Sequence, residues 1–390
     1  MFALDHRGTI RAPPQGKARI MSRRSYPLVL IASLTACAPQ TPAAAAPPEP
    51  APVQEVAQPV APIPEGFFAL TPQLVVSDVH AAVTFYTAAF EARPLFSLPG
   101  PDGKSMHAEV AIGDSIVMID AEGGGMKSPA SLGGTPATLM IYVPDADAVY
   151  ERAVAAGATA EFPLADQFWG DRYGQLIDPA GHRWAIATHL EDLTDEQMQK
   201  RAELMMAEMA AAAKKGKKPA ATKKPKEPSW KQVTATPTEN PVPAEYHTVT
   251  MSIVTSDAQA AIAFYEKAFA ATEINRMPTP DGKLMHAELQ IGDTRLMLSD
   301  EFPETGSKSA AAIGGSPVML HHYVENADTT FARALAAGAI EILPLADVFW
   351  GDRYGAVADP SGFGWGIATH IEDVSPEQMA ERMQAQPTPG

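Results

Sequence analysis

An internal repeat dominates this chain of 390 residues and limits what it can fold into. The matching phrases are easy to quote: MHAE at 106–109 and 285–288, and FWGDRYG at 168–174 and 349–355. The offset is 179 residues early and 181 residues late, so copy two has two extra residues in the loop after Asp120 and Asp300. Copy one covers about 66–213 and copy two about 245–386. Solenoid repeats are roughly 20–50 residues long. The longer period here indicates tandem domains.

Each copy is in turn predicted to consist of two similar halves. Residues 68–76 alternate as a strand, and Ser77-Asp78 is an N-cap signal before apolar residues at helical spacing. A PDGK turn and a Gly-Asp turn then separate two further strands. The second half repeats this order, with a helix over 145–156 and two strands flanking the DPAG turn at 178–181. The pattern predicts an α+β fold of paired βαβββ modules.

The phrases LTPQLVVSD, FWGDRYG, DPAGHRW and ATHLED resemble the vicinal oxygen chelate superfamily, which includes glyoxalase I, extradiol dioxygenases and bleomycin-resistance proteins. They look most like its PhnB-like branch. The resemblance implies curved mixed sheets, covered by helices on one face and forming a cleft on the other. Both arrangements occur in this superfamily, so the clefts could close within a copy or between copies, and the two domains could pair within the chain.

Strand alternation places a His-x-Glu pair of each copy in the expected cleft. These side chains could contact a ligand or take part in acid–base chemistry. Alternatively, they are solvated or bonded to each other and have no ligand. The last strand of each copy ends in a histidine at the cleft rim, and the arginine of each FWGDRYG loop could clamp an anionic ligand, or pair locally with aspartate. The candidate ligand-binding residues are His107, Glu109, Arg172, His189, His286, Glu288, His321, Arg353 and His370.

The resemblance also allows a test for a metal site. Metal-dependent members place His and Glu ligands on four strands. The matching positions hold other residues: Thr71, Met118, Thr138 and Ala185 in copy one, and Thr250, Met297, Met319 and Gly366 in copy two. Hydroxyl and thioether groups are poor ligands for the divalent ions concerned. We therefore expect no metal and no other cofactor. A displaced divalent site of His286, Glu288 and His321 stays open as an alternative.

The N-terminal region has the features of an export signal. Two arginines precede a short apolar run, which ends in Leu34-Thr35-Ala36-Cys37. This sequence resembles the lipobox of bacterial lipoproteins. The resemblance implies cleavage before Cys37, the only cysteine, and its lipidation. A lipid anchor would hold the protein on the bacterial cell envelope, in the outer membrane facing the periplasm.

Composition divides the chain into five parts. Residues 1–37 are an upstream extension and signal peptide, and 38–64 are a tether rich in Pro and Ala. The first glyoxalase-like domain with a C-terminal helix spans 65–213, a Lys-rich linker spans 214–244, and the second domain spans 245–390. The net charge of −16 argues against a nucleic-acid partner.

Three functions follow from these observations. The first is metal-independent binding of a small, partly apolar molecule in the two clefts. The second is a lyase, isomerase or dioxygenase with a non-standard metal site. The third is a structural envelope lipoprotein with vestigial clefts. The sequence leaves open whether either domain is catalytic, and it does not identify the ligand.

Overall fold

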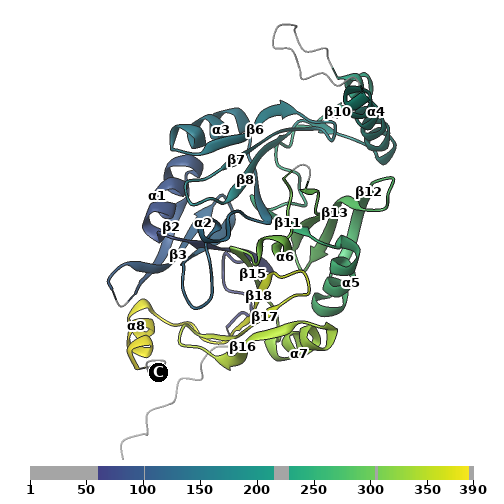
Figure 1. Ribbon diagram of the computed structural model, residues 1–390. Coiled ribbons are helices and arrows are strands. Elements are labelled where there is room, and N and C mark those ends of the chain that lie inside the picture. The colour runs from purple at the N-terminus through teal and green to yellow at the C-terminus, as the bar shows by residue number, and fades with distance from the viewer. Residues whose placement is uncertain (1–59, 101, 215–227, 304–305, 386–390) are drawn as a thin grey trace, which may run out of the picture. The chain divides into compact units, whose positions relative to one another are not determined.

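The computed structural model describes residues 60–100, 102–214, 228–303 and 306–385 (Figure 1). The predicted signal peptide, Cys37 and most of the tether lie outside these residues, as do the lysines of the linker between 215 and 227. None of the helices among the described residues combines the length and the apolar character that a membrane span requires.

Two mixed sheets of eight strands each form the framework. The strands of the first sheet are, in spatial order, β16 (Ile340–Asp347), β17 (Asp352–Ala358), β18 (Gly364–His370), β15 (Val318–Tyr323), β1 (Leu70–Val76), β4 (Ser115–Ala121), β3 (Ser105–Ile112) and β2 (Arg93–Pro99). Those of the second sheet are β12 (Thr272–Pro278), β13 (Leu284–Ile291), β14 (Thr294–Asp300), β11 (Val249–Thr255), β5 (Ala137–Tyr142), β8 (Arg183–His189), β7 (Asp171–Ile177) and β6 (Thr159–Asp166).

Each sheet takes one half from each copy, which answers the question that the sequence left open. In the first sheet, β1 of copy one runs antiparallel to β15 of copy two, with Thr71 opposite His321. In the second sheet, β5 and β11 make the equivalent contact, with Met140 opposite Thr250. The predicted α+β class and the tandem βαβββ modules are confirmed, and the two sheets form between copies.

Four amphipathic helices cover one side of the sheets: α1 (Val79–Phe90), α3 (Ala146–Ala155), α5 (Ala258–Phe269) and α7 (Ala327–Ala337). Each begins at an Asp or Asn whose side chain accepts a hydrogen bond from a first-turn amide, as Asp78 does from Ala81. The short helices α2 (Pro129–Leu132) and α6 (Ala310–Ile313) precede β5 and β15. One continuous apolar core lies between these helices and both sheets.

The DPxG turns anchor the last strand of each half-sheet to this core. The carboxylate of Asp178 accepts hydrogen bonds from the hydroxyl of Tyr86 at 2.8 Å and from the indole of Trp184 at 2.9 Å. In copy two, Asp359 has the same bonds with Tyr265 and Trp365. Both tryptophans are fully buried. The hydrogen bonds that this buried carboxylate accepts hold each turn in a fixed position.

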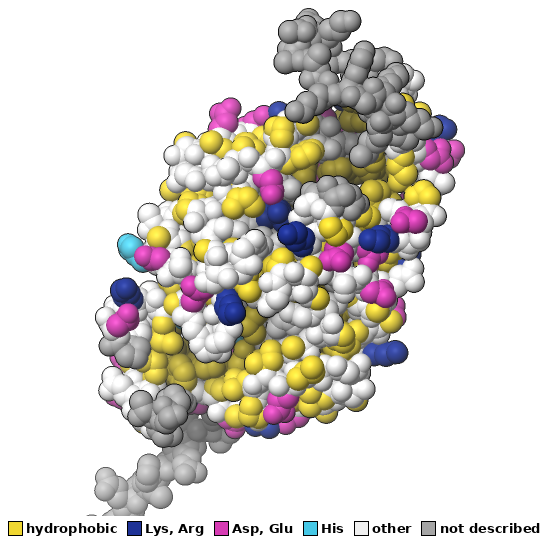
Figure 2. Space-filling model, in the orientation of Figure 1, with side chains coloured by type: hydrophobic (Ala, Val, Ile, Leu, Met, Phe, Trp, Pro, Cys, Tyr) yellow, Lys and Arg dark blue, Asp and Glu magenta, His cyan; other side chains and the backbone are white. Residues whose placement is uncertain are grey.

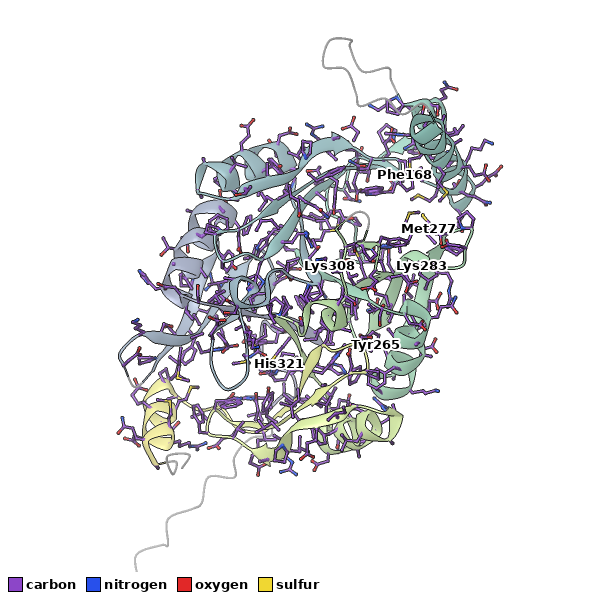
Figure 3. The ribbon with its side chains drawn as sticks, in the orientation of Figure 1. Phe168, Tyr265, Met277, Lys283, Lys308 and His321 are labelled. Atoms are coloured by element: carbon purple, nitrogen blue, oxygen red, sulfur yellow. The ribbon has the colours of Figure 1, made fainter. Side chains whose placement is uncertain are left out.

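The residues after β8 form an additional layer at one end of the second sheet. It consists of β9 (Glu191–Asp192), α4 (Asp195–Lys214), the 3₁₀-helix η1 (Ser229–Gln232) and β10 (Thr236–Pro237). Trp230 of η1 is buried and packs with Phe168, Ala202 and Met277; Phe168 and Met277 lie beside α4 in Figure 3. The described end of the predicted linker is thus part of the packed protein. The corresponding helix of copy two, α8 (Pro376–Ala385), has no buried residue in its described part.

Candidate functional site

Each sheet has one side against the helices and one side away from them. We call the side of the first sheet away from the helices face 1 and that of the second sheet face 2. Each has its own small apolar cluster, separate from the main core. Figure 2 shows apolar side chains gathered in two recessed areas, one beside α8 and one beside α4. The predicted His-x-Glu pair of copy one lies on face 1, and that of copy two lies on face 2.

A short segment before the first strand of each copy packs against each face. We call residues 60–67 strap 1 and residues 238–246 strap 2. In strap 1, Phe67 packs edge-on against Tyr323 of face 1, with ring centroids 5.3 Å apart. In strap 2, Tyr246 lies 5.3 Å from Tyr142 of face 2. Each strap also accepts a backbone hydrogen bond from the rim histidine of its sheet, at 3.0 Å and 2.9 Å.

Face 1 carries a chain of polar side chains on three neighbouring strands. The ring Nδ1 of His107 lies 2.8 Å from Asp120 Oδ1, and its Nε2 lies 3.6 Å from Glu109. The other oxygen of Asp120 accepts a hydrogen bond from Gln73 at 2.6 Å. Burial opposes the charge on His107, but the two carboxylates outweigh it and raise the pKa of this histidine to about 9. Face 1 therefore holds an imidazolium at neutral pH.

This ion pair predicts a pH dependence of stability. The pKa of His107 in the folded state, about 9, exceeds its ordinary value of 6.5, so the stabilisation is complete below pH 6.5 and disappears as pH rises through about 9. We expect wild type and His107→Gln to differ most in unfolding free energy below pH 6.5 and to converge above pH 9. Nuclear magnetic resonance titration of the ring should give a midpoint near 9, lowered in Asp120→Asn. A wild-type midpoint near 6.5 would contradict the pairing.

His321 lies on the same face, on β15 between two tyrosine rings. It is 4% exposed, stacks on Tyr354 with centroids 5.6 Å apart, and lies 4.6 Å from Tyr323. Burial lowers its pKa to about 3, and the nearby histidines His322 and His107 add to the effect, so its ring is neutral. Its Nε2 atom is buried and has no hydrogen-bond partner. In Figure 3, His321 lies in the interior near β15 and β18.

Face 2 has a different polar arrangement. His286 Nε2 lies 3.0 Å from Glu288 Oε1, but Ser299 stands opposite His286 where face 1 has Asp120. Burial opposes ionisation of Glu288, yet hydrogen bonds from His286 and Tyr246 lower its pKa overall. The position that matches His321 is Met140, which belongs to the apolar cluster of face 2. The two faces are therefore not equivalent.

The FWGDRYG loops form a structural hub at the edge of each face. In copy one, Asp171 is 2% exposed and accepts hydrogen bonds from the side chains of Tyr142, Trp169 and His189. Asp352 does the same with Tyr323, Trp350 and His370. The hydrogen bond to Asp171 raises the pKa of His189 to about 8 despite partial burial. The rim histidines predicted from the sequence are thus each held by a buried aspartate.

The two loop arginines lie on the other side of their sheets. Arg172 pairs with Asp147 of α3 and lies 3.1 Å from Asp166, and Arg353 pairs with Asp328 of α7 at 2.7 Å. Alternation along β7 and β17 directs them to the helix side, since the aspartate before each is at the face. The structure therefore does not bring Arg172 and Arg353 to a ligand on either face, and it matches the local Asp–Arg pairing considered above.

The donor set does not fit the metal site of the fold family. Four of the eight positions meet on face 1, Thr71, Met118, Met319 and Gly366, and four on face 2, Thr250, Met297, Thr138 and Ala185. The displaced divalent site considered for His286, Glu288 and His321 is not formed, because His321 lies on face 1 and the other two lie on face 2. Among the described residues, no cluster of three or more His, Cys, Asp or Glu is arranged to hold a metal ion.

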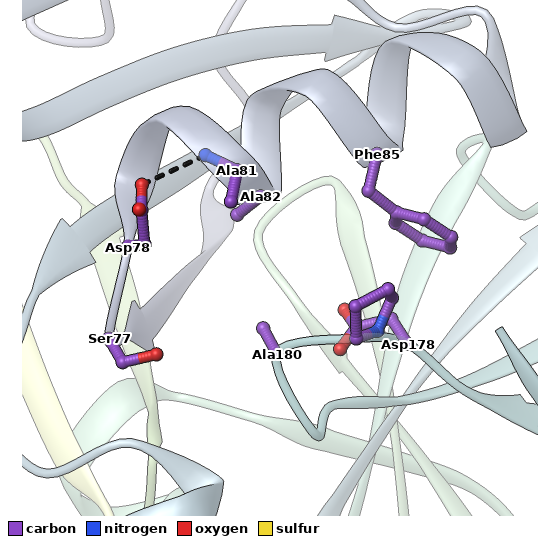
Figure 4. Close-up of a pocket in the computed structure, with 8 residues that line it drawn as sticks. Ser77, Asp78, Ala81, Ala82, Phe85, Asp178 and Ala180 are labelled. Carbon is purple, nitrogen blue, oxygen red and sulfur yellow. Dashed lines mark hydrogen bonds between the residues drawn. The ribbon is translucent and has the colours of Figure 1, made fainter. Parts of the chain in front are cut away.

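Two surface cavities lie beside the DPAG turn instead, on the helix side. The smaller, of about 60 Å³, is lined by the start of α1 and the turn, including Asp78 and Asp178 (Figure 4). The larger, of about 370 Å³, lies between the turn and α2. Asp78 caps α1 and Asp178 already accepts several hydrogen bonds. These cavities therefore offer few uncommitted polar groups to a ligand.

Sequence reasoning missed several polar residues of the two faces: Gln73, Asp120, Tyr246 and Arg295. The signal for three of them was present. Met118 and Met297 occupy expected ligand positions, so strand alternation also places Asp120, two residues later, and Arg295, two residues earlier, on the same face. Alternation from Thr71, another expected ligand position, does the same for Gln73, which lies beside Met118 across the β1–β4 pair. Tyr246 had no such signal, because it precedes the strand.

The comparisons with known proteins agree with this fold. The family model described as Glyoxalase/Bleomycin resistance protein/Dioxygenase superfamily matches residues 68–186 and 246–367. An uncharacterized protein of Mycobacterium tuberculosis is 44% identical over 136 residues, which cover 34% of this chain and 80% of that protein. Protein YjdN of Escherichia coli is 32% identical over 91 residues, 23% of this chain and 59% of that protein.

The chain is also similar to solved structures, among them glyoxalase I from Zea mays. It aligns with a TM-score of 0.48 and 13% identity over 77% of this chain and 92% of that chain. TioX from Micromonospora sp. ML1 is 30% identical, with a TM-score of 0.26, over 30% of this chain and 95% of that chain.

Proposed function

Because the chain belongs to the glyoxalase/bleomycin resistance protein/dioxygenase superfamily and carries its module repeatedly, we propose that faces 1 and 2 bind small, partly apolar molecules through their own side chains, without a metal ion. Within this superfamily, the protein would belong to the PhnB-like branch. A lipid on Cys37 would hold it at the bacterial cell envelope, which the lipobox-like sequence supports.

The observation that carries this proposal is the position of unpaired polar atoms. Among the described residues, buried side-chain nitrogen and oxygen atoms without a partner include Gln73 Oε1 and His321 Nε2 on face 1, and Arg295 Nε and Nη1 on face 2. Two others, on Ser128 and His182, lie elsewhere. Each unpaired buried group costs roughly 1–3 kcal/mol. A ligand that bonds to these atoms would recover that cost.

The walls of both faces suit such a ligand. Met118, Tyr323 and Tyr354 line face 1, and Met140, Tyr142 and Met297 line face 2. Methionine and aromatic side chains adapt to apolar ligands of varied shape. The small residue Gly366 does not leave an open space on face 1, because a side chain there would meet the rings of Tyr354 and His321. We therefore expect ligands to lie beside these rings and beneath the straps.

A calorimetric titration with naphthalene-2-methanol, a neutral probe with one hydroxyl, tests the proposal. We expect saturable binding at pH 7. His321→Met, which copies Met140 of face 2, should weaken one class of site about 5- to 10-fold through the loss of a hydrogen bond of ~1 kcal/mol. Arg353→Met, on the helix side, is the matched control and should leave binding unchanged. The absence of saturable binding in the wild-type protein would refute the proposal.

A further inference from the structure

Arg295 is a half-buried cation on face 2, and two of its guanidinium nitrogens have no hydrogen-bond partner in the described part of the chain. It lies on β14 two residues before Met297, and so on the side away from the core. Its Nε and Nη1 atoms are buried and donate to no acceptor among the described residues. A guanidinium is always charged and carries five N–H donors, so burying it without an acceptor is costly.

The polar neighbours of Arg295 make hydrogen bonds elsewhere. Glu288 on the adjacent strand β13 is bonded to His286 at 3.0 Å, and it also receives the hydroxyl of Tyr246. Directly across the β13–β14 pair is Gln290, whose amide nitrogen donates to the carbonyl of Gly292. Thr250, next on β11, donates to the carbonyl of His247. None of these neighbours accepts a hydrogen bond from Nε or Nη1 of Arg295.

The matching position of face 1 is Ile116, which is 8% exposed and lies beneath strap 1 near Gly66. Face 1 also carries two carboxylates, Glu109 and Asp120, around the single imidazolium of His107. Around Arg295, face 2 carries one carboxylate, Glu288, and the imidazole of His286. Another ion pair on this side of the sheet, between Arg183 and Glu161, adds no net charge. The charges therefore favour an anionic ligand on face 2 and disfavour it on face 1.

On this basis, and resting on the function proposed above, we propose that face 2 is specific for an apolar molecule that bears a carboxylate, with Arg295 as its anchor. The carboxylate oxygens would accept hydrogen bonds from the unpaired guanidinium nitrogens. The apolar part would lie against Met297, Met140 and Tyr142, beneath strap 2. Face 1, with Ile116 at this position, would bind neutral molecules.

Two probes of the same shape separate this inference from the general one. Naphthalene-2-carboxylate and naphthalene-2-methanol are titrated into the full chain by calorimetry at pH 7 and low salt. We expect the carboxylate to bind one site per chain. Arg295→Ile, which copies face 1, should weaken carboxylate binding at least 10-fold and leave binding of the alcohol at face 1 unchanged. Arg295→Lys should weaken carboxylate binding less. Circular dichroism melting checks that each variant is folded.

The outcomes are distinct. If the alcohol binds but the carboxylate does not, or if folded Arg295→Ile binds the carboxylate as the wild type does, the anionic preference is wrong and the general binding proposal stands. If neither probe binds, the general proposal fails and this one with it. Raised salt should weaken binding of the carboxylate more than binding of the alcohol, because only carboxylate binding depends on a charge.

Discussion

Copy one on its own, as residues 60–214, is expected to fold only when it associates with a second molecule. In the full chain, β1 pairs with β15 and β5 with β11, each along five positions, and both partners come from copy two. Without them, two half-sheets are left with open inner edges at strands that are almost fully buried, such as β1 and β5. Two fragments could restore both sheets by repeating the pairing seen here.

Size-exclusion chromatography with light scattering, together with circular dichroism, measures this directly. The folded fragment should have the mass of a dimer, and its melting temperature should rise with concentration. The chain of residues 60–385 is the control and should fold as a monomer whose melting temperature is independent of concentration. A fragment that is folded and monomeric at low concentration would contradict the exchanged pairing of the half-sheets.

Gly351→Ala is expected to be the most damaging single substitution among the loop glycines. Gly351 has φ +99°, and an added Cβ would collide with the carbonyl oxygen of Glu372 and with Val374. Its own carbonyl accepts the amides of Ile371 and Glu372, so the backbone cannot easily move away. Strain and overpacking together should cost about 2–4 kcal/mol of unfolding free energy.

A matched control isolates the collision from the backbone conformation. Gly338 has φ +112°, but a Cβ there would meet nothing within 4 Å. Gly338→Ala should therefore cost about 1 kcal/mol, the penalty of the conformation alone. Urea denaturation of both variants gives the two values. Equal losses would show that the loop before Asp352 is not as tightly packed as described.

Local patterns predicted the elements well because they depend on neighbours in the sequence. Ser77-Asp78 is an N-cap signal by its own residues and the apolar spacing that follows, and Asp78 caps α1 as predicted. The helix expected over 145–156 is present as α3, with Asp145 as its cap. Alternation placed His107 and Glu109 on the side away from the helices, where they lie. The pairing of β1 with β15 rather than β5 was not predictable, because both halves carry the same pattern and either pairing buries it.

The site was predictable only in part, since it depends on contacts between distant strands. The sequence predicts that His321 lies beside His286 and Glu288, because all three belong to copy two. The structure separates them, because each sheet takes one half from each copy. Arg172 and Arg353 suggested a ligand clamp by chemistry, but their strands direct them to Asp147 and Asp328. The unpaired nitrogens of Arg295 could only be found from the three-dimensional contacts of its neighbours.

One titration decides whether the faces bind ligands without a metal ion. The protein is treated with a strong chelator, dialysed, analysed for metal content and titrated with naphthalene-2-methanol. We expect the same affinity and stoichiometry before and after treatment, and no gain when zinc, iron(II), manganese or nickel is added back. About one metal ion per chain, with binding lost on its removal and restored by its return, would show instead that binding depends on the metal.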